Sequence, residues 1–183
     1  MEVKEISRDK VQSDALDVAI NNNRATLGIS MGVGKTRIAI QHLMKLYDPF
    51  IRVLVVVPKW SVKDSWENEL QKMGNLKLIH HIEFSTYLSL NKLNPLDYDI
   101  VYLDECHSLL ETHDTFLSEF KGRILGLTGT PPKSGEKLKM VNKYCPVKYT
   151  FSVDDAADND ILNDYQIIVH ELELSRVKNV KKS

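Results

Sequence analysis

The sequence predicts an α/β protein, a three-layer sandwich in which helices cover both faces of a mainly parallel sheet. Short apolar runs typical of buried strands alternate along the chain with stretches of helical periodicity, an order that requires crossover connections between parallel strands. A glycine-rich loop, Ser30 to Thr36 (SMGVGKT), stands between a strand-like and a helix-like segment. The polar motifs follow predicted strands, and parallel sheets bind ligands at the carboxyl ends of their strands.

The length and composition predict one folded domain. A chain of 183 residues can bury a core of its own, but a second full domain does not fit. Hydrophobic residues make up 43% and charged residues 27%, as in soluble globular proteins. No apolar run approaches the roughly 20 residues of a membrane span, and the charged N-terminus is unlike a signal peptide, so we expect a cytoplasmic protein without a membrane partner. The net charge of −1 argues against a generally basic nucleic-acid binder but allows a local basic strip.

The elements expected in the first part of the chain follow one another closely. Apolar residues at helical spacing predict three helices, and buried β-branched or apolar runs predict two strands. The helices are Lys10 to Asn22, Thr36 to Tyr47 and Ser61 to Lys72, and the strands are Ala25 to Ile29 and Arg52 to Val57.

The later elements are less regular. Two further buried strands are expected at Tyr98 to Leu103 and Arg123 to Leu127, and the first of them ends on two acidic residues. The remaining expectations are a weaker strand at Leu76 to Ile82, a turn or short helix at Phe84 to Leu90, helices at Thr115 to Phe120 and Glu136 to Asn142, a strand at Val147 to Phe151, an acidic turn or helix at Asp154 to Asp160, an extended run at Tyr165 to Leu174 and a basic tail at Ser175 to Ser183.

The glycine loop has the residue types that a phosphate-binding loop needs. Gly32 and Gly34 allow a tight turn that brings main-chain N–H groups up to phosphate oxygens at the positive end of the following helix. Lys35 is placed to reach the β and γ phosphates, and the Thr36 hydroxyl to ligate Mg²⁺. The full motif has a further glycine where this chain has Ile29. The alternative is an ordinary helix-entry turn with a solvated lysine.

An acidic pair follows the predicted strand at Tyr98 to Leu103. Asp104 is placed to hold Mg²⁺ and Glu105 to orient the attacking water, the two groups that phosphate hydrolysis needs besides the loop. Taken alone, such a pair is more often a solvated strand end. The glycine loop in the same chain favours the catalytic interpretation.

Five ordered motifs resemble those of superfamily 2 helicases and translocases. Asp104 to His107, DECH, resembles the DExH box, and MGVGKT is similar to the nucleotide loop of Swi/Snf-type motors, which also lacks the first glycine. The other three similar segments are VVPKW with Trp66 downstream (motif Ia), FSTYLSL (motif Ib) and LTGTPP (motif III in its remodeller and restriction-translocase form). The resemblance covers residues 8 to 132 and includes restriction and phage helicases.

This resemblance implies a P-loop NTPase fold, with residues 1–152 as a first RecA-like lobe, and ATP with Mg²⁺ as cofactors. It implies nucleic acid as a partner, and we expect DNA. Catalytic roles would fall to Lys35, Asp104 and Glu105, and metal binding to Thr36 and Asp104. The residues that the resemblance assigns to nucleotide binding are Gln12, which would read adenine, and Met31, Gly32, Val33, Gly34, Lys35, Thr36 and Arg37. It assigns contacts with the nucleic-acid backbone to Lys59 and Thr86. It assigns the coupling between nucleotide and nucleic acid to His107, Thr128, Gly129 and Thr130.

Four other residues have plainer interpretations. Cys106 replaces the small residue usual in the box and is interpreted as packing, not as a nucleophile. Cys106 and Cys145 stand far apart in the sequence, so we expect reduced thiols. Trp60 and Trp66 could stack on bases, but Trp66 lies on the apolar side of its helix and is assigned to the core. No four suitably spaced ligands suggest a zinc site.

Motors of this family have two lobes, and the second supplies an arginine to the ATP site. After Pro132 we find no second glycine loop, and Arg176 is the only arginine beyond Arg123. We therefore interpret residues 153–183 as an exit segment toward an absent second lobe. The predicted function is that of an N-terminal motor lobe of a DNA-directed helicase or translocase from a phage or bacterium, which binds ATP but hydrolyses it poorly alone. The alternative is a nucleotide-binding regulatory or docking module without motor activity; a small-molecule P-loop kinase is disfavoured by LTGTPP.

Overall fold

A six-stranded sheet forms the middle layer of the computed structural model, which describes residues 7–152 and residue 155. The strand order is β3-β2-β4-β5-β1-β6, and every neighbouring pair is parallel. The strands are β1 (Arg24–Ile29), β2 (Val53–Val57), β3 (Ile82–Thr86), β4 (Ile100–Asp104), β5 (Arg123–Thr128) and β6 (Val147–Phe151).

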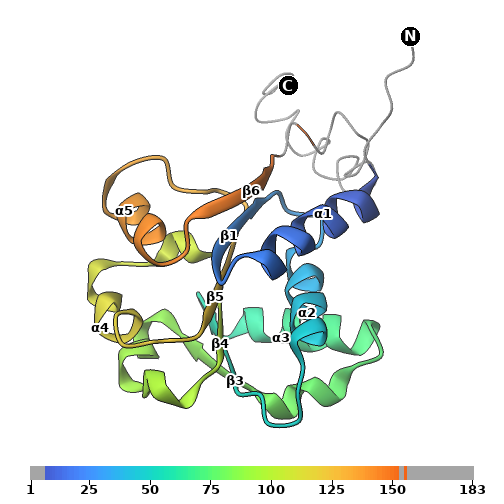
Figure 1. The fold of residues 1–183 in the computed structure, drawn as a ribbon, viewed down its shortest axis with the longest axis horizontal. Coiled ribbons are helices and arrows are strands. Elements are labelled where there is room, and N and C mark those ends of the chain that lie inside the picture. The colour runs from blue at the N-terminus through green and yellow to red at the C-terminus, as the bar shows by residue number, and fades with distance from the viewer. Residues whose placement is uncertain (1–6, 153–154, 156–183) are drawn as a thin grey trace.

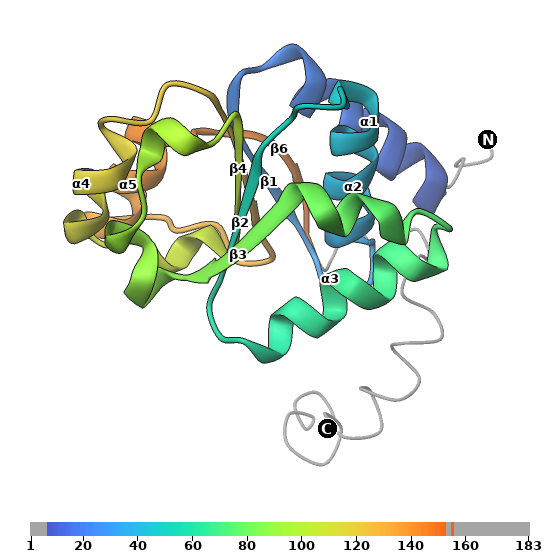
Figure 2. The ribbon, with the colours of Figure 1, turned by 90° about the horizontal axis from the view of Figure 1, so that it is seen from below.

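Helices cover both faces of the sheet (Figure 1). The helices are α1 (Arg8–Asn21), α2 (Lys35–Leu46), α3 (Ser61–Lys72), α4 (Asp114–Leu117) and α5 (Gly135–Tyr144). Figure 2 shows α1, α2 and α3 on one side and α4 and α5 on the other. The predicted three-layer sandwich with a mainly parallel sheet is therefore confirmed.

The central strands are buried because both faces of the sheet carry a hydrophobic core. In β2, Val53, Val55 and Val57 pack into the core under α1 to α3, whereas Leu54 and Val56 pack into the core under α4 and α5. Successive side chains of a strand point to opposite faces, so a strand covered on both sides must be apolar throughout. This explains the uninterrupted VLVVV run from which the strand was predicted.

The segment before β3 corrects one expectation. The predicted strand at Leu76 to Ile82 is wrong, because Leu76–His81 is a 3₁₀ helix and the strand begins at Ile82. β3 pairs with β2 from Val53↔Ile82 to Val57↔Thr86, so Phe84 lies in a strand and not in a turn. The 3₁₀ helix Tyr87–Lys92 confirms only the second half of the turn predicted at Phe84 to Leu90.

The other predicted elements in the described part of the chain differ mainly at their ends. α3 has the predicted bounds, α1 begins earlier at Arg8, where the Ser7 side chain accepts a hydrogen bond from the Lys10 amide, and α4 is shorter than expected. The expectations for 154–160, 165–174 and 175–183 lie outside the described residues, apart from Asp155. None of the described helices combines the length and apolar character of a membrane span.

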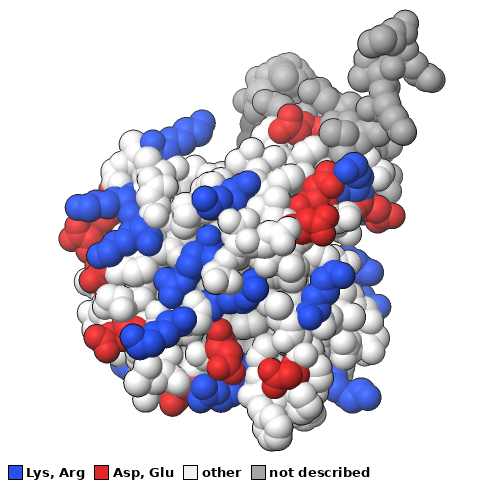
Figure 3. All heavy atoms as spheres, viewed as in Figure 1, with Lys and Arg blue, Asp and Glu red and all other residues white. Residues whose placement is uncertain are grey.

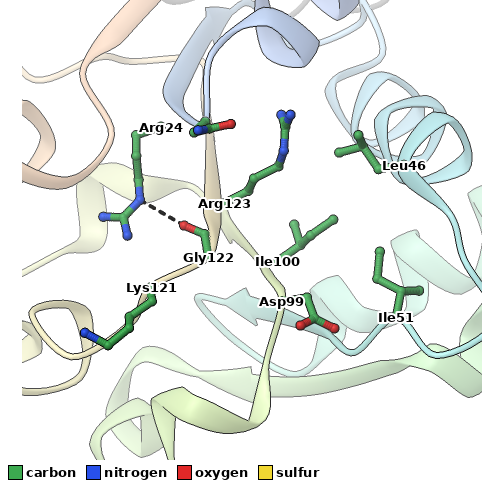
Figure 4. Close-up of a pocket in the computed structure, with 9 residues that line it drawn as sticks. Arg24, Leu46, Ile51, Asp99, Ile100, Lys121, Gly122 and Arg123 are labelled. Carbon is green, nitrogen blue, oxygen red and sulfur yellow. Dashed lines mark hydrogen bonds between the residues drawn. The ribbon is translucent and has the colours of Figure 1, made fainter.

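A hollow of about 500 Å³ lies where β1, β4 and β5 begin, at the opposite end of these strands from the polar motifs (Figure 4). Arg24 donates from Nε to the Gly122 carbonyl at 3.0 Å and from Nη2 to the Phe120 carbonyl at 2.9 Å. Arg123 donates from Nη1 to the Ile20 carbonyl at 3.2 Å. These arginines therefore bind the main chain that leads into β1 and β5. On the face viewed in Figure 3, Lys and Arg side chains spread across the middle with Asp and Glu among them.

Candidate nucleotide site

The glycine loop joins the end of β1 to the start of α2, as the sequence predicted. Gly32 and Gly34 have φ of 93° and 102°, in the left-handed region that favours glycine. A Cβ on Gly34 would lie 2.6 Å from Gln12 Nε2, so a side chain at this position would also have to displace the Gln12 amide. Ile29, at the place of the missing first glycine, is the last residue of β1 and is fully buried. The turn therefore begins only after it.

The acidic pair lies at the same end of the sheet as the loop. Asp104 is the last residue of β4, and Glu105 follows with φ 52° and ψ 58°, a left-handed conformation rare for a residue with a side chain. Lys35 Nζ lies 3.5 Å from Glu105 Oε2. The structure thus brings together Lys35 and Glu105, which are 70 residues apart in the sequence.

Asp104 is a buried carboxylate with few partners. Burial raises its pKa, an effect opposed by a hydrogen bond from Trp66 and by the charge of Lys35. Trp66 Nε1 donates to Asp104 Oδ2 at 2.9 Å, and the Tyr87 hydroxyl donates to the Asp104 carbonyl at 2.7 Å. Among the described residues Asp104 has no ion pair within 4.0 Å, so its negative charge is free to attract a cation.

These residues fit a magnesium nucleotide. A carboxylate and a hydroxyl are oxygen ligands of the kind Mg²⁺ binds, and Asp104 and Thr36 would supply them. The Ser30 hydroxyl, at the start of the loop, is buried and has no hydrogen-bond partner in the part of the chain described. A phosphate oxygen or its water would satisfy this polar atom. Ser30 was not among the predicted site residues, because its burial cannot be read from a single sequence.

The predicted coupling residues lie between the loop and the acids. His107 Nδ1 is 2.8 Å from Thr128 Oγ1 and 3.8 Å from Glu105 Oε1. The Thr130 amide donates to Thr128 Oγ1 at 3.0 Å. A Cβ on Gly129 would lie 3.8 Å from Lys35 Nζ. The end of β5 therefore contacts His107 beside the acids and lies close to Lys35 of the loop.

The remaining predicted nucleotide residues border the loop. Gln12 is buried, and its Nε2 donates to the Val33 carbonyl at 2.6 Å. Arg37 pairs with Glu69 of α3 at 2.9 Å, a partner that the sequence did not indicate. A hollow of about 390 Å³ lies between the loop and α3, and its lining includes Met31, Gly32, Gly34, Lys35, Thr36, Arg37 and Glu69.

The two residues assigned to nucleic acid lie at the same end of the sheet. Lys59 is exposed beyond the end of β2, and Thr86 is the partly exposed last residue of β3. β2 and β3 are neighbours, and Val57 at the end of β2 is the register partner of Thr86. Lys59 and Thr86 therefore follow or end neighbouring strands. The glycine loop follows β1, which β4 and β5 separate from β2 in the sheet.

Residues 5–133 match the family model described as "Type III restriction enzyme, res subunit". The chain belongs to this family. The match coincides closely with the range over which the sequence resembled superfamily 2 helicases, and the first RecA-like lobe of that superfamily is confirmed as the identity of the fold. The proposed boundary between residues 152 and 153 remains a prediction.

Known proteins similar to this res-family lobe include viral and phage helicases. The putative ATP-dependent RNA helicase QP509L of African swine fever virus (isolate Pig/Kenya/KEN-50/1950) is 30% identical over 135 residues, covering 59% of this chain and 25% of the viral protein. The crystal structure of the UvsW helicase from bacteriophage T4 has a TM-score of 0.67 at 15% identity, covering 81% of this chain and 62% of that one.

A restriction enzyme shares the fold as well. A nuclease-deletion mutant of the Type ISP enzyme LlaGI, in complex with a DNA substrate mimic, has a TM-score of 0.59 at 18% identity, covering 98% of this chain and 22% of that one. At such identities these solved structures establish the fold alone. The chain spans about a quarter of the length of the viral relatives it matches.

Proposed function

We propose that this chain is the N-terminal ATP-binding motor lobe of a DNA-directed superfamily 2 helicase or translocase. The observation that carries the proposal is the convergence of two motifs at one sheet end, where Lys35 Nζ lies 3.5 Å from Glu105 Oε2. A lysine at a glycine loop beside a buried, unpaired aspartate is the arrangement that binds a triphosphate with its magnesium.

Each residue then has a distinct task. The loop amides and Lys35 hold phosphate oxygens, and Thr36 and Asp104 hold the metal. Mg²⁺, when bound, would neutralise charge on the phosphate oxygens. Glu105 orients the attacking water and accepts its proton, and His107 beside it contacts Thr128 at the end of β5. The contact between Lys35 and Glu105 keeps both charges compensated until phosphate competes for the lysine.

Hydrolysis by the lobe alone should be slow, because arginines supplied from a second element contribute about 10³ to 10⁵ in turnover in related phosphate-transfer enzymes. We expect the chain to bind MgATP with little steady-state turnover, with or without nucleic acid. The measurement is phosphate release by the monomeric chain in the presence of DNA, RNA or neither. Brisk turnover stimulated by DNA would contradict the need for a second lobe.

DNA is the proposed partner, with RNA as the competing one. The solved LlaGI structure contains a DNA substrate mimic, whereas the viral relatives are named as putative RNA helicases. Lys59 and Thr86 would contact backbone phosphates, so Lys59→Ala should weaken binding about equally across sequences and lower the salt dependence by about one phosphate contact. Titration of matched DNA and RNA strands at several salt concentrations tests both points. Binding of RNA alone would overturn the choice of DNA.

A further inference from the structure

Trp66 holds the Asp104 carboxylate from the side of α3. The indole is fully buried, and its ring contacts Tyr102 at 5.8 Å and Phe84 at 6.5 Å between ring centroids. Packed on these rings, the indole has one N–H to donate, and it donates to Asp104 Oδ2 at 2.9 Å. The orientation of the carboxylate is therefore set by a rigid group.

Tyr87 holds the main chain of the same residue. Its buried hydroxyl donates to the Asp104 carbonyl at 2.7 Å, and its own carbonyl lies 2.9 Å from Nε2 of the buried His113. The Asp104 carbonyl belongs to the peptide that leads into Glu105, whose φ is 52°. A left-handed residue of this kind persists only where its surroundings fix it, and this hydrogen bond is one such constraint.

We propose that Trp66 and Tyr87 are positioning residues for the magnesium site, with Trp66 aiming the side chain of Asp104 and Tyr87 fixing the peptide between Asp104 and Glu105. The inference rests on the proposed function, since it assumes that Asp104 binds the metal. Neither aromatic residue touches substrate or metal; each acts through Asp104.

The proposal follows from how carboxylates bind metals. A carboxylate oxygen that accepts a fixed hydrogen bond cannot rotate freely, so the other oxygen is kept toward the cation, and loss of such partners typically weakens metal binding 10- to 100-fold. Trp66 lies on the helix that follows Lys59, and Tyr87 follows Thr86 directly. One hydrogen bond thereby joins Asp104 to the segment that contains Lys59 and Trp66, and another joins it to the segment that contains Thr86 and Tyr87.

The first test measures the Mg²⁺ concentration that half-saturates binding of a fluorescent, non-hydrolysable ATP analogue, without nucleic acid. Trp66→Phe keeps a large ring but removes the N–H, and we expect it to raise this concentration about tenfold or more. Trp60→Phe is the matched control, because Trp60 is 56% exposed at the start of the same helix. We expect the control to match the unmodified chain.

Tyr87→Phe removes only a hydroxyl. Loss of one hydrogen bond should raise the half-saturating Mg²⁺ concentration about threefold or more. Tyr98→Phe is the matched control, since the Tyr98 hydroxyl donates to Glu83 Oε1 at 2.7 Å, away from the loop and the acids. Urea unfolding of each variant separates a general loss of stability from an effect on the metal site.

A double-variant cycle decides whether Trp66 acts through the carboxylate. In an Asp104→Ala background, Trp66→Phe should leave the Mg²⁺ dependence unchanged. If Trp66→Phe lowers stability but keeps the magnesium midpoint within twofold of its control, the indole is only a core residue and the inference is wrong. If the unmodified chain binds no nucleotide, or Lys35→Ala binds it equally well, the proposed function fails instead.

Discussion

At the scale of single residues, substitutions of Lys35 and Glu105 should have different effects on nucleotide binding and on hydrolysis. Lys35→Ala removes the loop cation that lies 3.5 Å from Glu105 Oε2, so we expect loss of nucleotide binding. Glu105→Gln keeps the size of the side chain but removes the base, and we expect binding to remain while residual hydrolysis falls. Equilibrium binding of labelled ATP and single-turnover hydrolysis measure the two effects. Equal ATP affinity in the Lys35 variant would remove Lys35 from its role.

The sequence predicted the residues of the candidate site but not how they contact one another. The glycines, lysine and acids could be predicted because each motif requires particular residue types at fixed local spacing. Trp66 was correctly assigned to the core, yet its hydrogen bond to Asp104 joins α3 to β4 and has no local signature. A buried indole needs a partner, and the identity of that partner depends on the tertiary fold.

At the scale of elements, the close approach of β1, β5 and the DECH segment gives a sharp prediction. A Cβ on Gly126 would lie 2.3 Å from Thr26 Oγ1 and 2.9 Å from Cys106 Sγ, so Gly126→Ala should destabilise the fold by about 2 kcal/mol through overpacking. Urea unfolding measures this change. Gly129→Ala is the control, because its added methyl meets no atom nearer than 3.5 Å. Equal stability of both variants would contradict the packing argument.

The same packing explains two cysteines that look unrelated in the sequence. Cys106 and Cys145 are both free and buried, and their side chains interact, which with burial raises the pKa of the Cys106 thiol. Thr26 Oγ1 lies 3.6 Å from Cys106 Sγ and donates to the Cys145 carbonyl at 2.6 Å. Both thiols are free, as expected, and the buried, compact Cys106 agrees with a packing role. Their proximity could not be predicted, because it arises from the position of β6 beside β1.

Element boundaries were predictable where burial on both faces made the sequence uniformly apolar, and less so at the sheet edge. β3 was misplaced because only one of its residues, Ser85, is buried and the strand includes the exposed Glu83. Leu76–His81, in contrast, contains three apolar residues, Leu76, Leu78 and Ile79, but folds as a 3₁₀ helix between α3 and β3. An edge strand is defined by its partner, here β2, more than by its own composition.

At the scale of the whole molecule, His42 connects one helical layer to the sheet and should make the fold sensitive to acid. Its Nδ1 lies 2.8 Å from the Tyr102 hydroxyl of β4, and its ring also hydrogen-bonds the backbone of Ala19 in α1. Burial, together with the positive charge of Arg123 and against the opposing effect of the Ala19 hydrogen bond, lowers the pKa of His42 to about 4. The neutral ring is therefore the form that the folded state requires.

The sign of the resulting pH dependence follows from linkage. Because the folded pKa lies below the ordinary value near 6.5, the unfolded chain binds the proton first, and stability is full above about pH 6.5 and falls toward pH 4. From pH 7 to pH 5 the loss from this group should be about 2 kcal/mol. His42→Gln removes the titration, so its free energy of unfolding should decline less over the same interval, even if it is lower at pH 7. Parallel urea titrations at both pH values measure the difference. If both proteins lose the same free energy of unfolding from pH 7 to pH 5, protonation of His42 does not oppose folding.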